Sequence, residues 1–310
     1  RPTQSYVGLF GYSNNATIKN IGLKDVNITG SYYVGGLLGN NFGGTISNSY
    51  ASGTVSGTDS VGGLVGNNFG GTIENSYASG TVSGTGDFVG GLVGYNQGTA
   101  TIENSYATGT VSGTDSVGGL VGYNYEATIK NSFYDNTKYT GNNSTHPGVT
   151  GKTTQEMSYG TTFKNASWDI VADSSVTSLT PVIKWDSINN KYVWAIAPLA
   201  LTYTLADKTT TYDGTTQTLS SFYTSNPFTI PTGYEFLNLT SADYKFQVDG
   251  ADVTGYKDAG TYSNIKVALN GTSATDKFLT ISSSGNTDGK LTINKKDLTI
   301  SAITANNKTY

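Results

Sequence analysis

A segment of about 28 residues occurs five times between residues 8 and 133, and this repeat constrains the fold more than any other feature of the sequence. Successive leucines are spaced 28, 27, 28 and 28 residues apart, and successive isoleucines are spaced 28, 27, 29 and 27 residues apart. The leucines are Leu9, Leu37, Leu64, Leu92 and Leu120, and the isoleucines are Ile18, Ile46, Ile73, Ile102 and Ile129. Because two independent positions keep one period, the repeat is structural.

Each copy consists of short apolar runs separated by glycine and turn residues. In the third copy the runs are residues 61–66 (VGGLVG), 72–77 (TIENSY) and 81–83 (TVS). They are too short for helices, and their apolar residues are mostly β-branched or aromatic, so they predict strands. Three strands per copy predict one coil of a parallel β-solenoid, in which equivalent residues stack about 4.8 Å apart from coil to coil.

Stacking of coils predicts ladders of identical residues. Strand alternation would place the isoleucine, the asparagine and the aromatic residue of each TIxNSY run on one face. An inward amide must be hydrogen-bonded, and stacked asparagines can pass hydrogen bonds along the axis, so we interpret these asparagines as structural. The predicted ladders are Asn20, Asn48, Asn75, Asn104 and Asn131, and Tyr50, Tyr77, Tyr106 and Phe133.

One position in the predicted coil conflicts with strand alternation. Leu64 and Val65 are adjacent and both apolar, whereas neighbouring residues of a strand face opposite ways. Two explanations stay open: a glycine-assisted bend that turns both residues inward, or an outward valine ladder that docks a partner.

The run VGGLVG followed by TIxNSY resembles the GLUG repeat of large bacterial surface proteins, including exoproteins similar to filamentous haemagglutinin. The resemblance covers residues 8–133. It implies a right-handed parallel β-helix and an adhesin that is secreted or held at the bacterial cell surface. It implies no particular ligand.

The repeat pattern ends at Phe133, and the next 65 residues contain all three tryptophans of the chain. The open end of a solenoid exposes its core and an unpaired strand edge, so we interpret residues 134–198 as an irregular last coil and C-terminal cap. Residues 152–157 predict a short helical turn. The alternative is an aromatic sugar-binding platform formed by Trp168, Trp185 and Trp194.

Residues 199–310 show alternating strands without the GLUG pattern. The sequence LTYTLADKTTTY at residues 201–212 is similar to LTISAITANNKTY at residues 298–310, so residues 199–297 are predicted to form one module of a tandem array. The runs TYDGTT, DAGTY and KLTINKKDLTI resemble the YDG or MBG modules of bacterial surface proteins. The resemblance implies a small all-β module; the spacing leaves a sandwich and a β-grasp variant open.

Composition excludes several function classes. The net charge is −4 and no run of lysine or arginine occurs, so we expect neither nucleic acid nor an anionic membrane surface as a partner. The sequence contains no stretch of 18 apolar residues, so we expect no insertion into a membrane. The absence of cysteine excludes disulfides, thiolate metal sites and cysteine nucleophiles, and we expect no cofactor.

Acidic residues occur at repeat positions rather than in a separate cluster. Asp59, Asp87 and Asp115 recur in the turn before VGG, and Glu74 and Glu103 follow the isoleucine. One acid per turn lacks the dense ligand set of a calcium site, and glycoside hydrolysis needs paired carboxylates, so a turn role is favoured over a metal or catalytic role. His146 has no evident partner. We therefore predict that the chain is not an enzyme.

These observations together predict an all-β segment of a large bacterial adhesin that mediates or projects adhesion to host cells, glycans or matrix. A purely structural stalk is the alternative, and a polysaccharide-acting β-helix enzyme is a third hypothesis. The expected partners are a host-surface glycan or protein and the rest of the same long chain, with the protein itself monomeric. Direct binding would use the solenoid face or the cap, and only residues 134–198 clearly break the repeat pattern.

Overall fold

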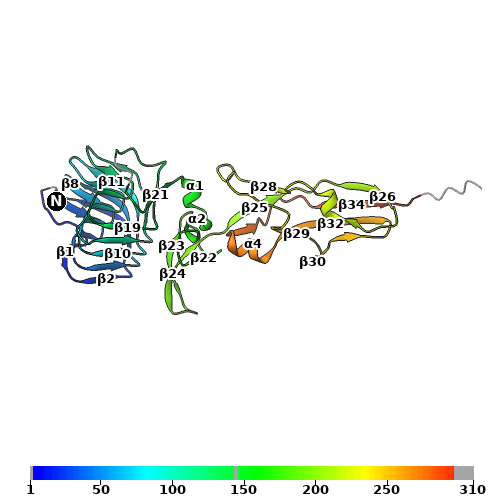
Figure 1. Cartoon of the computed structure of the whole chain (residues 1–310), viewed down its shortest axis with the longest axis horizontal. Helices are drawn as coiled ribbons and strands as arrows, with labels where there is room; N and C mark the ends of the chain where they lie inside the picture. The colour runs from blue at the N-terminus through cyan, green and yellow to red at the C-terminus, as the bar shows by residue number, and fades with distance from the viewer. Residues whose placement is uncertain (1–2, 143–145, 297–310) are drawn as a thin grey trace, which may run out of the picture. The chain divides into compact units, whose positions relative to one another are not determined.

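The computed structural model describes residues 3–142 and 146–296. The chain divides into two compact units, Arg1–Pro198 and Leu199–Tyr310, and each is described by itself. In the first unit, parallel strands stack from coil to coil into a β-solenoid that a segment with two short helices follows (Figure 1).

The solenoid consists of four parallel sheets, to which successive coils contribute strands. The first sheet contains β1 (Phe10–Asn14), β5 (Leu38–Phe42), β9 (Val65–Phe69), β13 (Val93–Gln97) and β18 (Val121–Tyr125). The second contains β2 (Thr17–Lys19), β6 (Thr45–Ser47), β10 (Thr72–Glu74), β14 (Thr101–Glu103) and β19 (Thr128–Lys130). The third contains β3 (Gly22–Thr29), β7 (Tyr50–Gly57), β11 (Tyr77–Gly84), β15 (Tyr106–Ala107), β16 (Val111–Ser112), β20 (Ser132–Asp135) and β21 (Val149–Lys152). The fourth contains β4 (Tyr32–Gly35), β8 (Asp59–Gly62), β12 (Val89–Gly90) and β17 (Val117–Gly118).

The prediction of three strands per coil is wrong because the VGGLVG run holds two strands with a corner between them. In the third copy β8 ends at Gly62 and β9 begins at Val65. The backbone N–H groups of Leu64 and Val65 both donate to the carbonyl oxygen of Leu92, at 2.9 and 3.1 Å. A Cβ atom on Gly62 would lie 2.0 Å from the Val65 carbonyl oxygen, so the corner requires glycine. The bend turns both Leu64 and Val65 inward, each fully buried, and it excludes the outward valine ladder.

The core of the solenoid is built from in-register ladders of aliphatic residues. Ile73 pairs with Ile46 on one side and with Ile102 on the other, as the repeat predicted. A second cluster consists of stacked valines and lies beside the first; it contains Val34, Val55, Val61, Val82, Val89, Val111 and Val117. Stacking of like residues keeps the interior closely packed along the axis.

The inward orientation predicted for the TIxN asparagines is wrong. Asn48, Asn75 and Asn104 have φ values of 48°, 46° and 47° and form corners between the second and third sheets. A left-handed corner, which asparagine tolerates better than most residues, shifts the alternation by one position. The following serines point inward instead: Ser76 and Ser105 are fully buried, and the N–H of Ser76 donates to Ser105 Oγ at 3.2 Å.

A buried amide ladder does exist, but it is formed by a different asparagine of each coil. Asn41 Nδ2 donates to Asn68 Oδ1 at 2.9 Å, and Asn68 Nδ2 donates to Asn96 Oδ1 at 2.8 Å. Asn96 Nδ2 continues the chain to Asn124 Oδ1 at 2.7 Å. Asn68 Nδ2 also donates to the carbonyl oxygen of Gly71 at 3.0 Å, and Asn41 and Asn124 make the equivalent bond to the turns of their own coils.

Residues 134–198 close the end of the solenoid and also cover part of its side. Tyr134, Tyr139 and Val149 pack against the last coil of the aliphatic core. The remainder comprises α1 (Thr154–Met157), α2 (Gly160–Lys164) and a three-stranded sheet in the order β22 (Ile170–Ala172), β24 (Lys191–Ile196), β23 (Val182–Asp186). The predicted helical turn at residues 152–157 is confirmed by α1.

The second unit consists of small mixed sheets. β25 (Leu199–Tyr203) lies between β28 (Phe228–Thr229) and β33 (Leu279–Ile281). A five-stranded sheet has the order β26 (Lys208–Thr211), β34 (Gly289–Asn294), β32 (Gly260–Leu269), β29 (Tyr244–Val248), β30 (Ala251–Asp252). A separate pair joins β27 (Gln217–Thr218) to β31 (Gly255–Tyr256), and the helices are α3 (Leu219–Phe222) and α4 (Gly271–Asp276). The predicted second copy at residues 298–310 lies outside the described residues.

Candidate binding groove on the cap

The predicted aromatic ladder forms on the outer wall of the solenoid rather than in its interior. Tyr50, Tyr77 and Tyr106 stack nearly parallel, with ring centroids 4.8 and 4.9 Å apart. The alanines that follow these tyrosines point into the core. A column of aromatic rings on an outer wall is costly to leave in water, and the cap covers it.

Trp168 and Trp194 belong to this covering layer. Trp194 lies 5.9 Å from Tyr77 and 5.6 Å from Tyr106, and Trp168 lies 4.8 Å from Trp194. Both indole rings are buried, and Trp168 Nε1 donates to the carbonyl oxygen of Asn131 at 2.8 Å. These two tryptophans therefore join the cap to the solenoid and are not accessible to a ligand in this arrangement.

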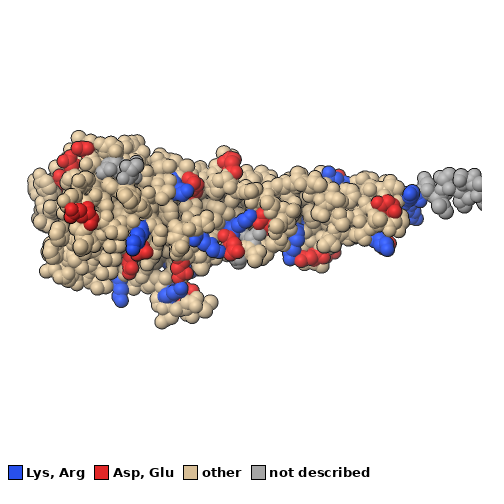
Figure 2. Space-filling model, in the orientation of Figure 1, with Lys and Arg blue, Asp and Glu red and all other residues tan. Residues whose placement is uncertain are grey.

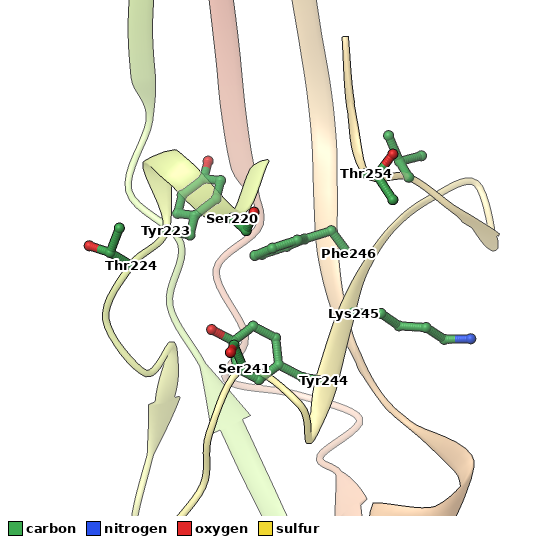
Figure 3. A pocket seen from close by; sticks show the side chains of 9 residues that line it. Ser220, Tyr223, Thr224, Ser241, Tyr244, Lys245, Phe246 and Thr254 are labelled. Atoms are coloured by element: carbon green, nitrogen blue, oxygen red, sulfur yellow. The ribbon is translucent and has the colours of Figure 1, made fainter. Parts of the chain in front are cut away.

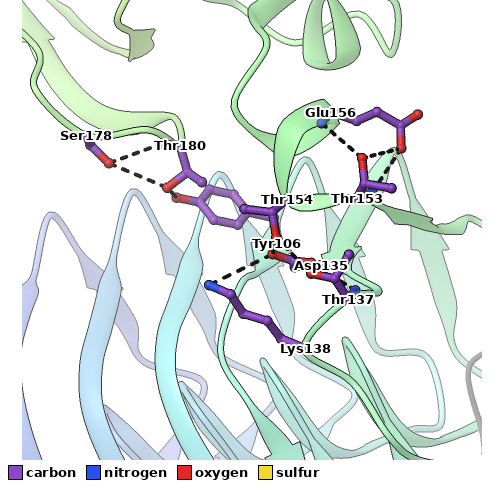
Figure 4. Close-up of polar contacts among 9 residues, drawn as sticks. All are labelled: Tyr106, Asp135, Thr137, Lys138, Thr153, Thr154, Glu156, Ser178 and Thr180. Atoms are coloured by element: carbon purple, nitrogen blue, oxygen red, sulfur yellow. Dashed lines mark hydrogen bonds and ion pairs between the residues drawn. The ribbon is translucent and has the colours of Figure 1, made fainter. Parts of the chain in front are cut away.

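Polar contacts across this junction and within residues 134–198 fix the position of the cap (Figure 4). The hydroxyl of Tyr106 donates to the carbonyl oxygen of Pro181 at 2.6 Å, and burial raises the pKa of that hydroxyl well above its ordinary value. The carboxylate of Asp135 is buried and accepts from Thr154 Oγ1 at 2.6 Å and from the Thr137 N–H at 3.0 Å. Buried polar groups with satisfied hydrogen bonds specify one geometry for the packed surfaces.

The start of α1 adds a reciprocal cap. Thr153 Oγ1 accepts from the Glu156 N–H at 3.2 Å, and the Thr153 N–H donates to Glu156 Oε2 at 2.9 Å. Burial opposes ionisation of Glu156, but the hydrogen bonds from Thr153 and the ammonium of Lys152 outweigh it and lower the pKa of the carboxyl. The sequence Thr-x-x-Glu at the helix start makes this capping box recognisable from sequence.

Trp185 lies apart from the other two tryptophans, on the hairpin formed by β23 and β24. Its side chain is 46% exposed, and its ring meets that of Tyr192 edge-on at 5.0 Å. Ile188 at the tip of the hairpin is 91% exposed. The predicted platform of three tryptophans is not assembled, but Trp185 remains available to a ligand.

Trp185 lines a groove of about 290 Å³ on the cap. Val171, Ile188 and Val193 supply apolar surface, and Asp173, Lys184, Asp186 and Ser187 supply polar groups. We call this set of eight residues the cap groove. Small-molecule sites combine an apolar wall with a few fixed polar groups, and the cap groove has both.

The charged groups of the cap groove are held by hydrogen bonds within the cap. The ammonium of Lys184 bonds to the carboxylate of Asp173, which also accepts from the N–H and hydroxyl of Ser175; these contacts lower the pKa of Asp173 to about 2. Asp186 accepts from the N–H groups of Ile188 and Asn189 and from the Asn189 side chain, which lower the pKa of its carboxyl. The polar groups are thus held in fixed positions.

Residues 3–142 and 146–296 contain no cluster of candidate metal ligands. No group of three or more His, Asp and Glu side chains in that part of the chain could hold a metal ion. Burial lowers the pKa of His146 below its ordinary value. Among the residues whose structure is described, no helix is long and apolar enough to cross a membrane. In Figure 2 acidic and basic side chains are scattered over the visible face rather than gathered in a stripe.

The fold and this surface define a repeat-built β-solenoid protein with an aromatic groove on its cap. A model of the GLUG motif matches residues 30–56, 57–83 and 89–112, which lie within the region that the sequence predicted. The GLUG resemblance is therefore confirmed for these repeats. No curated protein gave a match.

The chain was also compared with solved structures, and one match follows. It is the crystal structure of a "putative immunoglobulin A1 protease" from Bacteroides ovatus, with a TM-score of 0.43 and 22% sequence identity. The alignment covers 62% of this chain and 64% of that chain. This chain therefore spans less than two thirds of the length of that protein.

Proposed function

We propose that this chain is a segment of a bacterial adhesin, secreted or held at the cell surface, and that the cap groove contacts a host glycan or protein. The observation that carries the proposal is the different exposure of the tryptophans. Trp168 and Trp194 are buried where the cap packs against the solenoid, whereas Trp185 is 46% exposed in a groove whose polar groups are held by hydrogen bonds. Exposed tryptophans in grooves are frequent hot spots of binding.

The GLUG match and the solenoid support the same proposal. A solenoid lengthens by adding coils and so suits a protein that projects a binding region from a surface. The segment would act as a monomer without a cofactor, within a longer chain. We assign residues 199–310 to the YDG or MBG type of module as part of this proposal, on the sequence runs that resemble it.

A purely structural stalk is the second candidate, and the in-register ladders favour it. Thr81 pairs with Thr54, and Ser83 pairs with Ser56 and Ser112, so the inner coils present nearly the same surface at each level. Such regularity serves length rather than recognition. The exposed hairpin of the cap is the feature that a stalk alone does not explain.

Binding by a Trp185→Ala variant tests the proposal. The purified chain is applied to epithelial cells and to a glycan array beside this variant and a Tyr125→Ala variant, which removes an exposed aromatic residue of the solenoid. We expect at least about tenfold weaker binding for Trp185→Ala, as for a central aromatic contact, and unchanged binding for Tyr125→Ala. Equal binding by the wild type and Trp185→Ala would remove the cap groove from the proposal. No binding by folded wild type would favour the stalk.

A further inference from the structure

The second unit contains a pocket that the proposed adhesive role of the cap does not explain. It has a volume of about 400 Å³ and lies among α3, β29 and the loop that precedes β31 (Figure 3). Pockets that bind small molecules have volumes of roughly 300–1,000 Å³, so this one is large enough for a ligand.

Three aromatic rings form the inner wall of the pocket. The ring of Phe246 lies 5.4 Å from that of Tyr223 and 5.7 Å from that of Tyr244, which it meets at 86°. Each of the three side chains is 7% exposed, so the wall is anchored in the core of the unit and holds its shape (Figure 3). Such a wall accepts the apolar face of a ligand.

The rim of the pocket carries aliphatic hydroxyl groups. They belong to Ser220, Thr224, Ser241 and Thr254, and all four residues are exposed. Within the part of the chain that the structure describes, none of the four hydroxyls forms a hydrogen bond, whereas the neighbouring Ser221 hydroxyl donates to the Thr218 carbonyl oxygen at 2.7 Å. The rim therefore offers four groups that can both donate and accept.

The pocket presents no free charge. Among the residues that the structure describes, Lys245 is the one charged residue that lines it, and its ammonium lies 2.7 Å from the carboxylate of Asp252. Figure 3 shows its amine directed away from the aromatic rings. A ligand that carries a charge would find no partner of opposite sign, whereas a neutral ligand with several hydroxyl groups would match the rim.

We propose that this pocket binds a neutral saccharide, with an apolar face of a pyranose ring against Tyr244 and Phe246 and its hydroxyl groups at the rim. A pyranose combines C–H groups on one face with hydroxyl groups around its edge, and these are the two kinds of surface that the pocket supplies. The site is separate from the cap groove and does not depend on it.

Saturation-transfer NMR on the full chain tests this proposal. The probes are methyl glycosides of glucose, galactose, mannose and N-acetylglucosamine, with lactose as a neutral disaccharide and sialyllactose as the charged comparison. We expect a signal from at least one neutral probe. A Ser241→Trp variant fills the pocket from its exposed rim and should weaken that binding at least tenfold. A Ser283→Trp variant, which makes the same change at an exposed serine outside the pocket, should leave it unchanged.

A double variant, Thr224→Val with Thr254→Val, removes two rim hydroxyls without adding bulk and should also weaken binding. Loss of binding in the pocket variants with retention in Ser283→Trp supports the proposal. Three results would overturn it: no signal from any neutral probe, a signal from sialyllactose alone, or equal binding by wild type and Ser241→Trp. Loss of binding only in Trp185→Ala would assign the saccharide to the cap groove instead.

Discussion

Two asparagines of each coil have different tasks, and their backbone conformations explain the difference. Asn75 has a left-handed conformation at a corner, where its side chain is half-buried. The side chain at the equivalent position of the next coil, Asn104, has a buried Oδ1 atom without a hydrogen-bond partner. Asn68, in contrast, is fully buried and hydrogen-bonds to the coils on both sides. Asn75 therefore contributes to the fold through its backbone conformation, and Asn68 contributes through the hydrogen bonds of its side chain.

Replacing each asparagine by glycine separates these tasks. Asn68→Gly leaves the Asn96 Oδ1 and the Gly71 carbonyl oxygen without their donor, and we expect a loss of about 3 kcal/mol in the free energy of unfolding. Asn75→Gly keeps the left-handed corner, so its effect should stay within about 0.5 kcal/mol. Urea unfolding followed by tryptophan fluorescence measures both. Equal losses at the two positions would contradict the assignment of the ladder.

The Asp173–Lys184 pair gives the cap a predictable response to acid. The pKa of Asp173 is about 2 in the folded protein and about 4 when the carboxyl is unperturbed, so folding favours its ionised form. The pair therefore stabilises the cap fully above about pH 4, and its contribution is lost as the pH falls toward 2. Asp173→Asn should lower stability at pH 7 by less than about 1 kcal/mol, because the pair is partly solvated.

Thermal unfolding of the wild type and Asp173→Asn at pH 7, 4 and 2 measures this response. We expect the difference in melting temperature to be largest at pH 7 and clearly smaller at pH 2, which is the pKa of Asp173 in the folded protein. A difference of the same size at every pH would show that the variant acts through packing rather than through the charge of Asp173.

At the scale of elements, the sequence predicted the repeat and its stacking direction but not the corners. The isoleucine ladder is confirmed because its period and strand type follow directly from the apolar pattern. The corners after Gly62 and at Asn75 depend on backbone conformations that interrupt the alternation of side chains along a strand. A prediction from uninterrupted alternation therefore placed Tyr77 and Asn75 on the wrong faces of the sheet. The asparagine of each TIxNS run was the sequence signal for this corner, since asparagine tolerates positive φ better than most residues.

The candidate site was predictable only in part, for a related reason. Residues 134–198 were identified as the segment that breaks the repeat, and their tryptophans as candidates for binding. Which tryptophan stays exposed depends on where the cap packs. The cap packs on the aromatic column of the outer wall, which strand alternation had placed inside the solenoid. Because Tyr77 and Tyr106 lie on the outer wall of the solenoid, Trp194 packs against their rings and is buried there. The pocket beside Phe246 carries no sequence motif, because residues from three separate segments form it.

At the scale of the whole molecule, the two units are built around separate cores. The aliphatic and valine clusters of the solenoid contain only residues of Arg1–Pro198. Buried side chains of the second unit, such as Leu201, Ile265 and Leu291, lie on its own strands. A compact part of a chain with its own core is expected to fold independently.

All three tryptophans lie in the first unit, so their fluorescence reports on that unit alone. We expect residues 1–198 produced alone to unfold at the same urea concentration as the first unit of the full chain. A lower midpoint for the isolated unit would show that residues 199–310 stabilise it. Residues 1–166 lack β22, β23 and β24 and all three tryptophans, so this fragment is followed by light scattering rather than by fluorescence. That fragment would uncover the outer column at Tyr77 and Tyr106, and we expect it to aggregate, because stacked aromatic rings without a covering sheet form a contiguous apolar surface.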